Sequence, residues 1–165
     1  MAQKALFPAL VFGALFILPL PAATVSFLVI ETGLSEEVGA SQHSGLWESG
    51  LLDVFFEAGH IVSNAPILRL SKGTAKIFPD EALESLREAV EGGMDFFIIA
   101  LLDYTAPNDT VIQKPEKISL RLFNAASQKL IYEQQYTDKT SKNPGEEFAS
   151  LKQAARGLVP HLNDR

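Results

Sequence analysis

Two continuous apolar runs dominate the pattern of hydrophobic and polar positions along this chain. One runs from Phe96 to Leu102 in MDFFIIALLDY, and the other runs from Val25 to Ile30 in TVSFLVIE. Each run is too short to cross a bilayer and lacks the alternation of a strand with one solvated face. The pattern therefore predicts two strands that are buried on both faces and lie side by side in the middle of one sheet.

The stretch SGLWESGLLDVFFEAG has the spacing of an amphipathic helix. Its apolar stripe recurs every three or four residues, and Ser44 and Gly59 are predicted as its N-cap and its C-terminal stop. Because Trp47 and Phe55 share this stripe, we expect them in the core rather than in a ligand platform. The stripe consists of positions 47, 51, 54, 55 and 58.

Two further helices are predicted by similar spacing. The first covers 80–91 and is closed by two glycines, and its inner side is expected to carry Leu83, Leu86 and Val90. The second follows NPGEEF near the carboxyl terminus, where Pro160 comes late enough to end or kink only the final turn. The stripe of this last helix consists of Phe148, Leu151, Ala155, Leu158 and Leu162.

Three more strands complete the pattern. The segment 60–70 is interrupted by Pro66 and is predicted as an edge strand, or as a short strand with an irregular extension. Residues 117–123 and 129–136 are predicted as an antiparallel hairpin. Right-handed crossovers then give an α/β three-layer sandwich with helices on both faces of a five-stranded mixed sheet, in the order 2-1-3-4-5 with strand 4 antiparallel. The most buried residues are expected to include Phe27, Val29, Phe97, Ile99 and Leu101.

Residues 1–23 have the layout of a secretory signal peptide, with one charge at Lys4, an apolar core and a final stretch of proline and alanine. Cleavage is expected at about Thr24, which leaves 24–165 as a single α/β domain. Cleavage after Ala22 and cleavage after Ala23 both remain candidates. A small residue is preferred two positions before the last residue that is removed, and neither cut has one there. An uncleaved anchor is the alternative, since the apolar stretch is nearly long enough to span a bilayer.

Composition narrows the class of protein. The chain has no cysteine, which excludes a disulfide framework and a lipid attached to cysteine. Its formal net charge is −6 at pH 7, and loss of Lys4 with the signal peptide makes the charge one unit more negative. Nucleic acid and anionic membrane surfaces are therefore disfavoured as main partners.

Four segments together resemble a known group of bacterial proteins: VSFLVIE, LLDVFFEAGHIV, MDFFIIALLDY and ISLRLFNAASQKLIYEQQ. The group comprises the amino-terminal domain of TolB, the curli secretion protein CsgG, the activator LpoB and the flagellar protein FlgT. The resemblance covers residues 24–160. It implies a periplasmic or outer-membrane adaptor or assembly factor rather than an enzyme, with no catalytic residues to carry over. Because some of these proteins are lipoproteins and some have further domains, no single job is implied for this chain.

The candidates for chemistry are few. Ser41 lies in GASQHSG, which superficially resembles a nucleophile elbow, but His43 replaces the second glycine and no strand leads directly into the segment. His43 is expected to be exposed in a long loop, and His60 and His161 are expected to be structural residues near helix ends. The triplet 108–110 fits a glycan acceptor, which matters only in a eukaryotic secretory pathway.

A metal site would have to combine His43 with carboxylates from the loops after the two central strands. Both loops leave the same edge of the sheet where strand order reverses, which is the usual ligand crevice of an open α/β sheet. No spacing matches a known ligand motif, so we expect solvated loop carboxylates, no metal and no cofactor. The carboxylates concerned are Glu31, Glu36, Asp103 and Asp109.

The sequence thus predicts an exported, non-catalytic protein-interaction domain that acts as an adaptor or assembly factor with other envelope proteins in the bacterial periplasm. Both sheet edges are expected to be open, and KLIYEQQY has polar and aromatic residues suited to pairing with a partner strand. Alternatively, Lys129, Glu133 and Pro66 block such pairing, as in ordinary monomers. The alternative function is a periplasmic protein that binds a small ligand or a divalent cation through the loops after the first and third strands.

Overall fold

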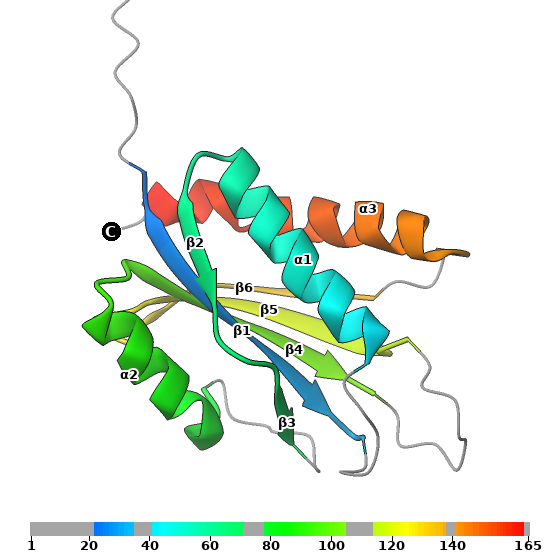
Figure 1. The fold of residues 1–165 in the computed structure, drawn as a ribbon, viewed down its shortest axis with the longest axis horizontal. Helices are drawn as coiled ribbons and strands as arrows, with labels where there is room; N and C mark the ends of the chain where they lie inside the picture. The colour runs from blue at the N-terminus through cyan, green and yellow to red at the C-terminus, as the bar shows by residue number, and fades with distance from the viewer. Residues whose placement is uncertain (1–21, 35–40, 71–77, 105–113, 138–140, 164–165) are drawn as a thin grey trace, which may run out of the picture.

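The computed structural model describes residues 22–34, 41–70, 78–104, 114–137 and 141–163. They form one mixed sheet with helices on both faces (Figure 1). The strands are β1 (Thr24–Thr32), β2 (Ile61–Asn64), β3 (Leu68–Leu70), β4 (Phe96–Asp103), β5 (Lys117–Asn124) and β6 (Leu130–Tyr136). The helices are α1 (Gln42–Glu57), α2 (Leu83–Glu91) and α3 (Pro144–Arg156), with 3₁₀ turns η1 (Asp80–Ala82) and η2 (Val159–Asn163). The predicted signal peptide lies outside the described residues, apart from its last two alanines.

The sheet has the order β2-β1-β4-β5-β6, and β3 also pairs with β1. The strands β2, β3 and β4 run parallel to β1, whereas β5 is antiparallel to both β4 and β6. This confirms the predicted fold class and strand order. The predicted strand over 60–70 is two short strands, because Pro66 lacks the N–H needed to continue the ladder between them.

The two central strands pair in parallel register from Val25 opposite Phe96 to Thr32 opposite Asp103. Every residue of β4 up to Leu102 is buried, because helices cover both faces of this part of the sheet. The residues predicted to be most buried are all in the core: Phe27, Val29, Phe97, Ile99 and Leu101.

The core is divided by the sheet into two layers. The helices α1 and α3 pack on one face, over Phe27 and Val29, and α2 packs on the other face, over Leu28 and Ile30 (Figure 1). The helices α1 and α3 touch closely at Gly50, where an added Cβ atom would lie 1.8 Å from Cδ1 of Leu151. A glycine at this position therefore lets the two helices share one layer.

The helix α1 begins earlier than predicted. Its N-cap is Ser41 rather than Ser44, and the Ser41 side chain accepts a hydrogen bond from the backbone N–H of His43. The apolar stripe begins only at Trp47, so the polar first turn gave no periodic signal. The predicted stop is confirmed, since Gly59 follows the helix with a φ of 83°.

The helix α2 turns a different side to the sheet from the one expected. Its inner side carries Leu86 and Ala89, next to Ala82 of η1, whereas Leu83 and Val90 are 47% and 42% exposed. The sheet and Phe78 fill this layer with large side chains, including the rings of Phe97 and Phe123. Alanines fit against such a surface better than leucine and valine do.

The last helix has the predicted stripe, in which Leu151, Ala155, Leu158 and Leu162 are buried and Phe148 is partly buried. Its α-helical part ends at Arg156, and Pro160 lies in η2. A proline ring would clash with the carbonyl four residues earlier in a continuous helix, which explains the break. Among the described residues, no helix has the length and apolar character needed to cross a membrane.

Candidate functional site

The carboxyl ends of β1 and β4 form the switch point of the sheet, which is the place where the strand order reverses. From β1 the chain passes through α1 to β2 on one side, and β4 lies on the other side of β1. The sequence analysis placed any ligand crevice at this edge. The residues there are Glu31 and Thr32 of β1, and Asp103 and Tyr104 at the end of β4.

Glu31 is a completely buried carboxylate at this edge. The side chain of Arg69, from β3, donates to it from Nε at 3.0 Å. The backbone N–H of Ser41 and the hydroxyl of Ser44 donate to its other oxygen at 2.9 and 2.5 Å. These donors offset the cost of removing the charge from water.

The position of Glu31 decides what the amino end of α1 can bind. In many α/β sheets the helix N-terminus after the first strand holds a phosphate or another anion. Here Glu31 takes that place, because it accepts from the N-cap residue Ser41 and from Ser44 in the first turn. The protein therefore supplies its own anion, with Arg69 as the counter-ion.

Tyr104 links the ends of the two central strands. Its hydroxyl lies 3.1 Å from the hydroxyl of Ser44, and burial raises the pKa of Tyr104, which keeps the phenol protonated at neutral pH. Gly33 has a φ of 83°, and an added Cβ atom there would lie 1.9 Å from the carbonyl oxygen of Tyr104. Only glycine allows the chain after β1 to pass so close to the chain after β4.

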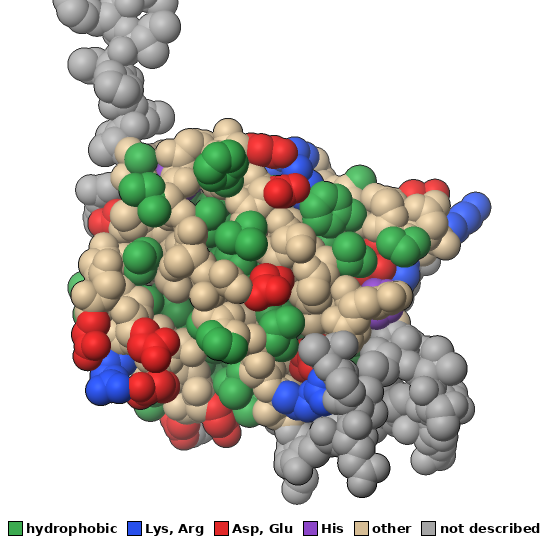
Figure 2. Space-filling view, viewed as in Figure 1, with side chains coloured by type: hydrophobic (Ala, Val, Ile, Leu, Met, Phe, Trp, Pro, Cys, Tyr) green, Lys and Arg blue, Asp and Glu red, His purple; other side chains and the backbone are tan. Residues whose placement is uncertain are grey.

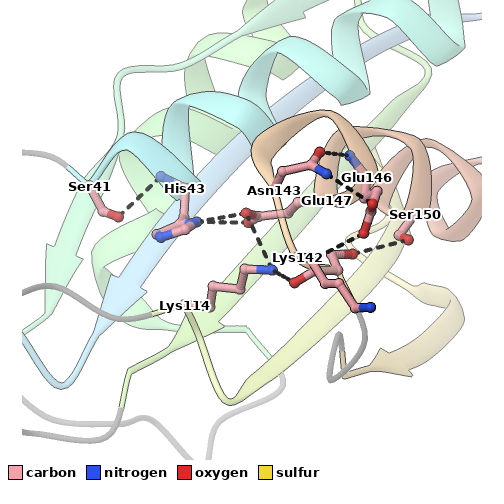
Figure 3. A network of polar contacts seen from close by, with 9 residues as sticks. Ser41, His43, Lys114, Lys142, Asn143, Glu146, Glu147 and Ser150 are labelled. Carbon is pink, nitrogen blue, oxygen red and sulfur yellow. Dashed lines mark hydrogen bonds and ion pairs between the residues drawn. The ribbon is translucent and has the colours of Figure 1, made fainter.

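A second polar cluster joins the first turn of α1 to the first turn of α3 (Figure 3). The Nδ1 atom of His43 lies 2.8 and 3.0 Å from the two carboxylate oxygens of Glu147, and both residues are buried. The Nζ atom of Lys114 lies 3.9 Å from Glu147 and donates to the carbonyl of Ser141 at 2.6 Å. This cluster fixes the relative position of the two helices.

The candidate metal ligands that the structure describes, His43, Glu31 and Asp103, do not form one cluster. His43 was expected in an exposed loop and is instead buried against Glu147, while Glu31 is held by Arg69. Asp103 is exposed and accepts from the hydroxyl of Thr32 at 3.1 Å. Within the part of the chain that the structure describes, no group of three or more histidine or acidic side chains could hold a metal ion. The candidates Glu36 and Asp109, and with the latter the triplet 108–110, lie outside the described residues.

The other candidates for chemistry have structural roles. Ser41 caps α1. His60 accepts at Nδ1 from the backbone N–H of Ala23 at 3.2 Å, and burial lowers its pKa. His161 lies in η2 and stacks on Tyr132 with 3.9 Å between ring centroids. Trp47 and Phe55 are core residues, as predicted.

A hollow of about 420 Å³ opens at the opposite end of the molecule, between the last turn of α1 and the end of α3. The switch-point residues do not line it, so it does not belong to the crevice that the sequence analysis considered. Its lining consists of Val54, Glu57, Ala58, Arg156, Val159 and Pro160.

The two sheet edges differ. Among the described strands, β6 pairs only with β5, and its edge runs from Leu130 to Tyr136 with a register shift at Ile131. The other edge is broken at Pro66 into the short strands β2 and β3. Among the described residues, large exposed apolar side chains are few outside the edges, and Figure 2 shows apolar side chains scattered between polar groups on the side of the molecule seen in Figure 1.

The chain belongs to a protein family that is described as "Uncharacterised protein", whose model matches residues 24–151. The matched range begins at β1 and ends within α3, so it takes in the whole sheet and the switch point. No curated protein matches the chain.

Several solved structures are similar to this chain, TolB among them as the sequence resemblance implied. The PelC dodecamer from Paraburkholderia phytofirmans is 8% identical, with a TM-score of 0.45 and coverage of 86% of this chain and 87% of that chain. TolB from Acinetobacter baumannii is 10% identical, with a TM-score of 0.42, and the match covers 87% of this chain but 28% of TolB. Lipoprotein GNA1162 from Neisseria meningitidis is 13% identical, with a TM-score of 0.39 and coverage of 88% and 100%. Similarity at this level says nothing about shared function.

Proposed function

We propose that this protein is an exported, non-catalytic protein-interaction domain that acts as an adaptor or assembly factor in a bacterial envelope. The observation that carries the proposal is the open edge of β6. An edge strand presents unpaired N–H and C=O groups, and a segment of another protein can pair with them as an added strand.

The edge of β6 has one feature that usually hinders such pairing, the register shift at Ile131, and lacks the others. The strand contains no proline, and its one charged residue, Glu133, is paired with Arg121 of β5 at 2.9 Å. Lys129, which was considered as a blocking charge, precedes the strand. Monomeric proteins normally protect such edges with lysines, prolines, β-bulges or inward-pointing charges.

The opposite edge does have such protection. It consists of strands of four and three residues with Pro66 between them, and Arg69 of β3 is engaged with Glu31. Of the two edges that the sequence analysis considered, β6 therefore offers the longer template for a partner strand.

The side chains of β6 indicate which partner strand would fit. Tyr132 and Tyr136 pack on the layer formed by α1 and α3, against His161 and Trp47 respectively. Glu133 and Gln135 are exposed. A strand that alternates apolar side chains beside the tyrosines with polar or basic side chains beside Glu133 would match both faces.

The switch point supports a structural role more than a catalytic one. The buried carboxylates have partners within the chain: Arg69 lies against Glu31, and His43 and Lys114 lie against Glu147. A binding site for a charged ligand would have to displace these partners, at the cost of leaving a buried charge uncompensated.

The test is crosslinking in the native cell with the wild-type chain and two variants that each add one lysine, Gln135→Lys on β6 and Gln153→Lys on α3. Both residues are exposed, so the two variants match in charge and chemistry. We expect Gln135→Lys to lose a captured partner protein that wild type and Gln153→Lys retain. Equal capture by all three would place docking elsewhere, and recovery of monomer with a co-purifying small molecule would favour the ligand-binding alternative.

The alternative function, binding of a small ligand or divalent cation at the switch point, is favoured by the topology alone. We expect no stoichiometric metal after dialysis and no hydrolase activity. A tightly held divalent ion that is lost when Asp103 and His43 are both replaced by alanine would reverse this ranking.

A further inference from the structure

Among the described residues before β1, Ala23 belongs to the folded domain and Ala22 does not pack into it. Ala22 is exposed, whereas Ala23 is only 2% exposed and belongs to the core beneath α1 and α3. The carbonyl of Ala23 accepts from the N–H of Ile61 at 3.0 Å, and its own N–H donates to Nδ1 of His60 at 3.2 Å. Ala23 is therefore part of the fold, whereas Ala22, the first residue that the structure describes, is not buried in it.

We propose that processing during export cuts the bond between Ala22 and Ala23, and that the α-amino group so formed stays hydrogen-bonded to His60. Hydrolysis adds water across this amide. The hydroxyl goes to the carbonyl carbon of Ala22, which leaves as the carboxyl end of the released peptide, and the hydrogen goes to the nitrogen of Ala23. That nitrogen already lies 3.2 Å from Nδ1 of His60, so the new terminus needs no rearrangement.

His60 suits this role. The hydrogen bond from Ala23 requires that Nδ1 carries no proton, and burial lowers the pKa of His60, which favours the neutral ring at pH 7. The imidazole ring lies beside the ring of Phe55, which belongs to the last turn of α1, with 6.4 Å between the ring centroids. A terminal ammonium group donates more strongly than an amide N–H, because the hydrogen bond is charge-assisted.

The rival cut, between Ala23 and Thr24, has one feature in its favour. The backbone nitrogen of Thr24 lies 3.0 Å from Oδ2 of Asp95, so an ammonium group there would meet a carboxylate. This cut would remove a buried methyl group, the acceptor of the Ile61 N–H and the donor to His60. The hydroxyl of Thr24 already donates to Asp95, so that carboxylate does not depend on the new charge.

The first test is the intact mass of the protein isolated after export from its full precursor. We expect a chain that begins at Ala23. A chain that begins at Thr24 would overturn this inference and leave export intact, whereas an uncut chain that begins at Met1 would overturn both. Neither result depends on docking at β6.

The second test is a double-mutant cycle on exported, processed proteins. It compares four proteins: the wild type, a variant without Ala23, His60→Phe, and the variant with both changes. In the variant without Ala23, cutting after Ala22 makes Thr24 the first residue. Loss of Ala23 should lower the melting temperature of the wild type by about 2–4 °C and that of the His60→Phe protein by less. Equal losses in the two backgrounds would show that the contact with His60 contributes nothing.

A third measurement does not depend on stability. Acylation of the terminal amine at pH 7 should be about tenfold slower in the wild type than in His60→Phe, because a hydrogen-bonded ammonium group gives up its proton less readily. His161→Phe is the matched control, since that histidine stacks on Tyr132 in η2. Equal labelling rates in all three proteins would contradict the contact between the terminus and His60.

Discussion

His43 and Glu147 are 104 residues apart in the sequence, yet the imidazole Nδ1 atom lies 2.8 Å from the carboxylate. The two residues come from the first turns of α1 and α3, and both side chains are at least nine-tenths buried. Because each residue lies in the first turn of its helix, the contact fixes the positions of the amino ends of α1 and α3 relative to one another. It also closes the carboxyl edge of the sheet beside Glu31.

Removing this carboxylate should destabilise the fold. Glu147→Ala leaves the buried His43 without this acceptor and removes the carboxylate near Lys114, and we expect a loss of about 1–3 kcal/mol in the free energy of unfolding. Urea denaturation measures this. Glu81→Ala, at an exposed position in η1, is the control and should change stability by no more than about 0.5 kcal/mol. Similar losses in both variants would show that the buried pair has no special role.

The contact between α1 and α3 can be tested with two glycines of the same helix. Gly50→Ala would place a methyl group 1.8 Å from the buried Leu151, so we expect a loss of about 1–3 kcal/mol from overpacking. Gly45→Ala meets no atom within 4 Å and should stabilise the protein by up to about 1 kcal/mol, because alanine favours the helix. Thermal melting distinguishes the two, and stabilisation by both substitutions would contradict the close packing at Gly50.

The central position of β4 predicts that Ile99→Asp prevents folding. Ile99 is fully buried, and an unpaired carboxylate there costs several kcal/mol against a total stability of about 5–15 kcal/mol. Leu83→Asp, on the exposed side of α2, is the control and should keep the fold. Circular dichroism reports both outcomes. A folded Ile99→Asp protein with the melting temperature of the wild type would show that β4 is not central.

His60 should make stability depend on pH. Burial lowers its pKa in the folded protein below the value of about 6.5 expected in the unfolded chain, so the unfolded chain binds more protons as the pH falls. The contribution of His60 is therefore fully present above pH 6.5 and decreases as the pH falls from there toward the lower, folded pKa. The melting temperature of the wild type should fall more between pH 7.5 and pH 5 than that of His60→Phe. Parallel curves for the two proteins would contradict this prediction.

The fold could be predicted largely from the sequence because its signals are local. Continuous apolar runs marked the two central strands, Pro66 marked the broken edge, and glycines marked the ends of α1 and α2. The handedness of crossovers then fixed the strand order, since only a few arrangements bury both runs. Each of these features depends on residues that are neighbours in the chain or on the chirality of the backbone.

The candidate site was decided by the tertiary structure. Ser41 rather than Ser44 caps α1 because Glu31 and the edge of the sheet lie beneath that turn, which no periodicity records. The inner side of α2 depends on the large side chains already placed beneath it. Nothing in the sequence indicated that Glu147 is the partner of His43. The energy of a buried polar contact depends on distance in space and on the exclusion of water, and both exist only once the sheet and helices have assembled.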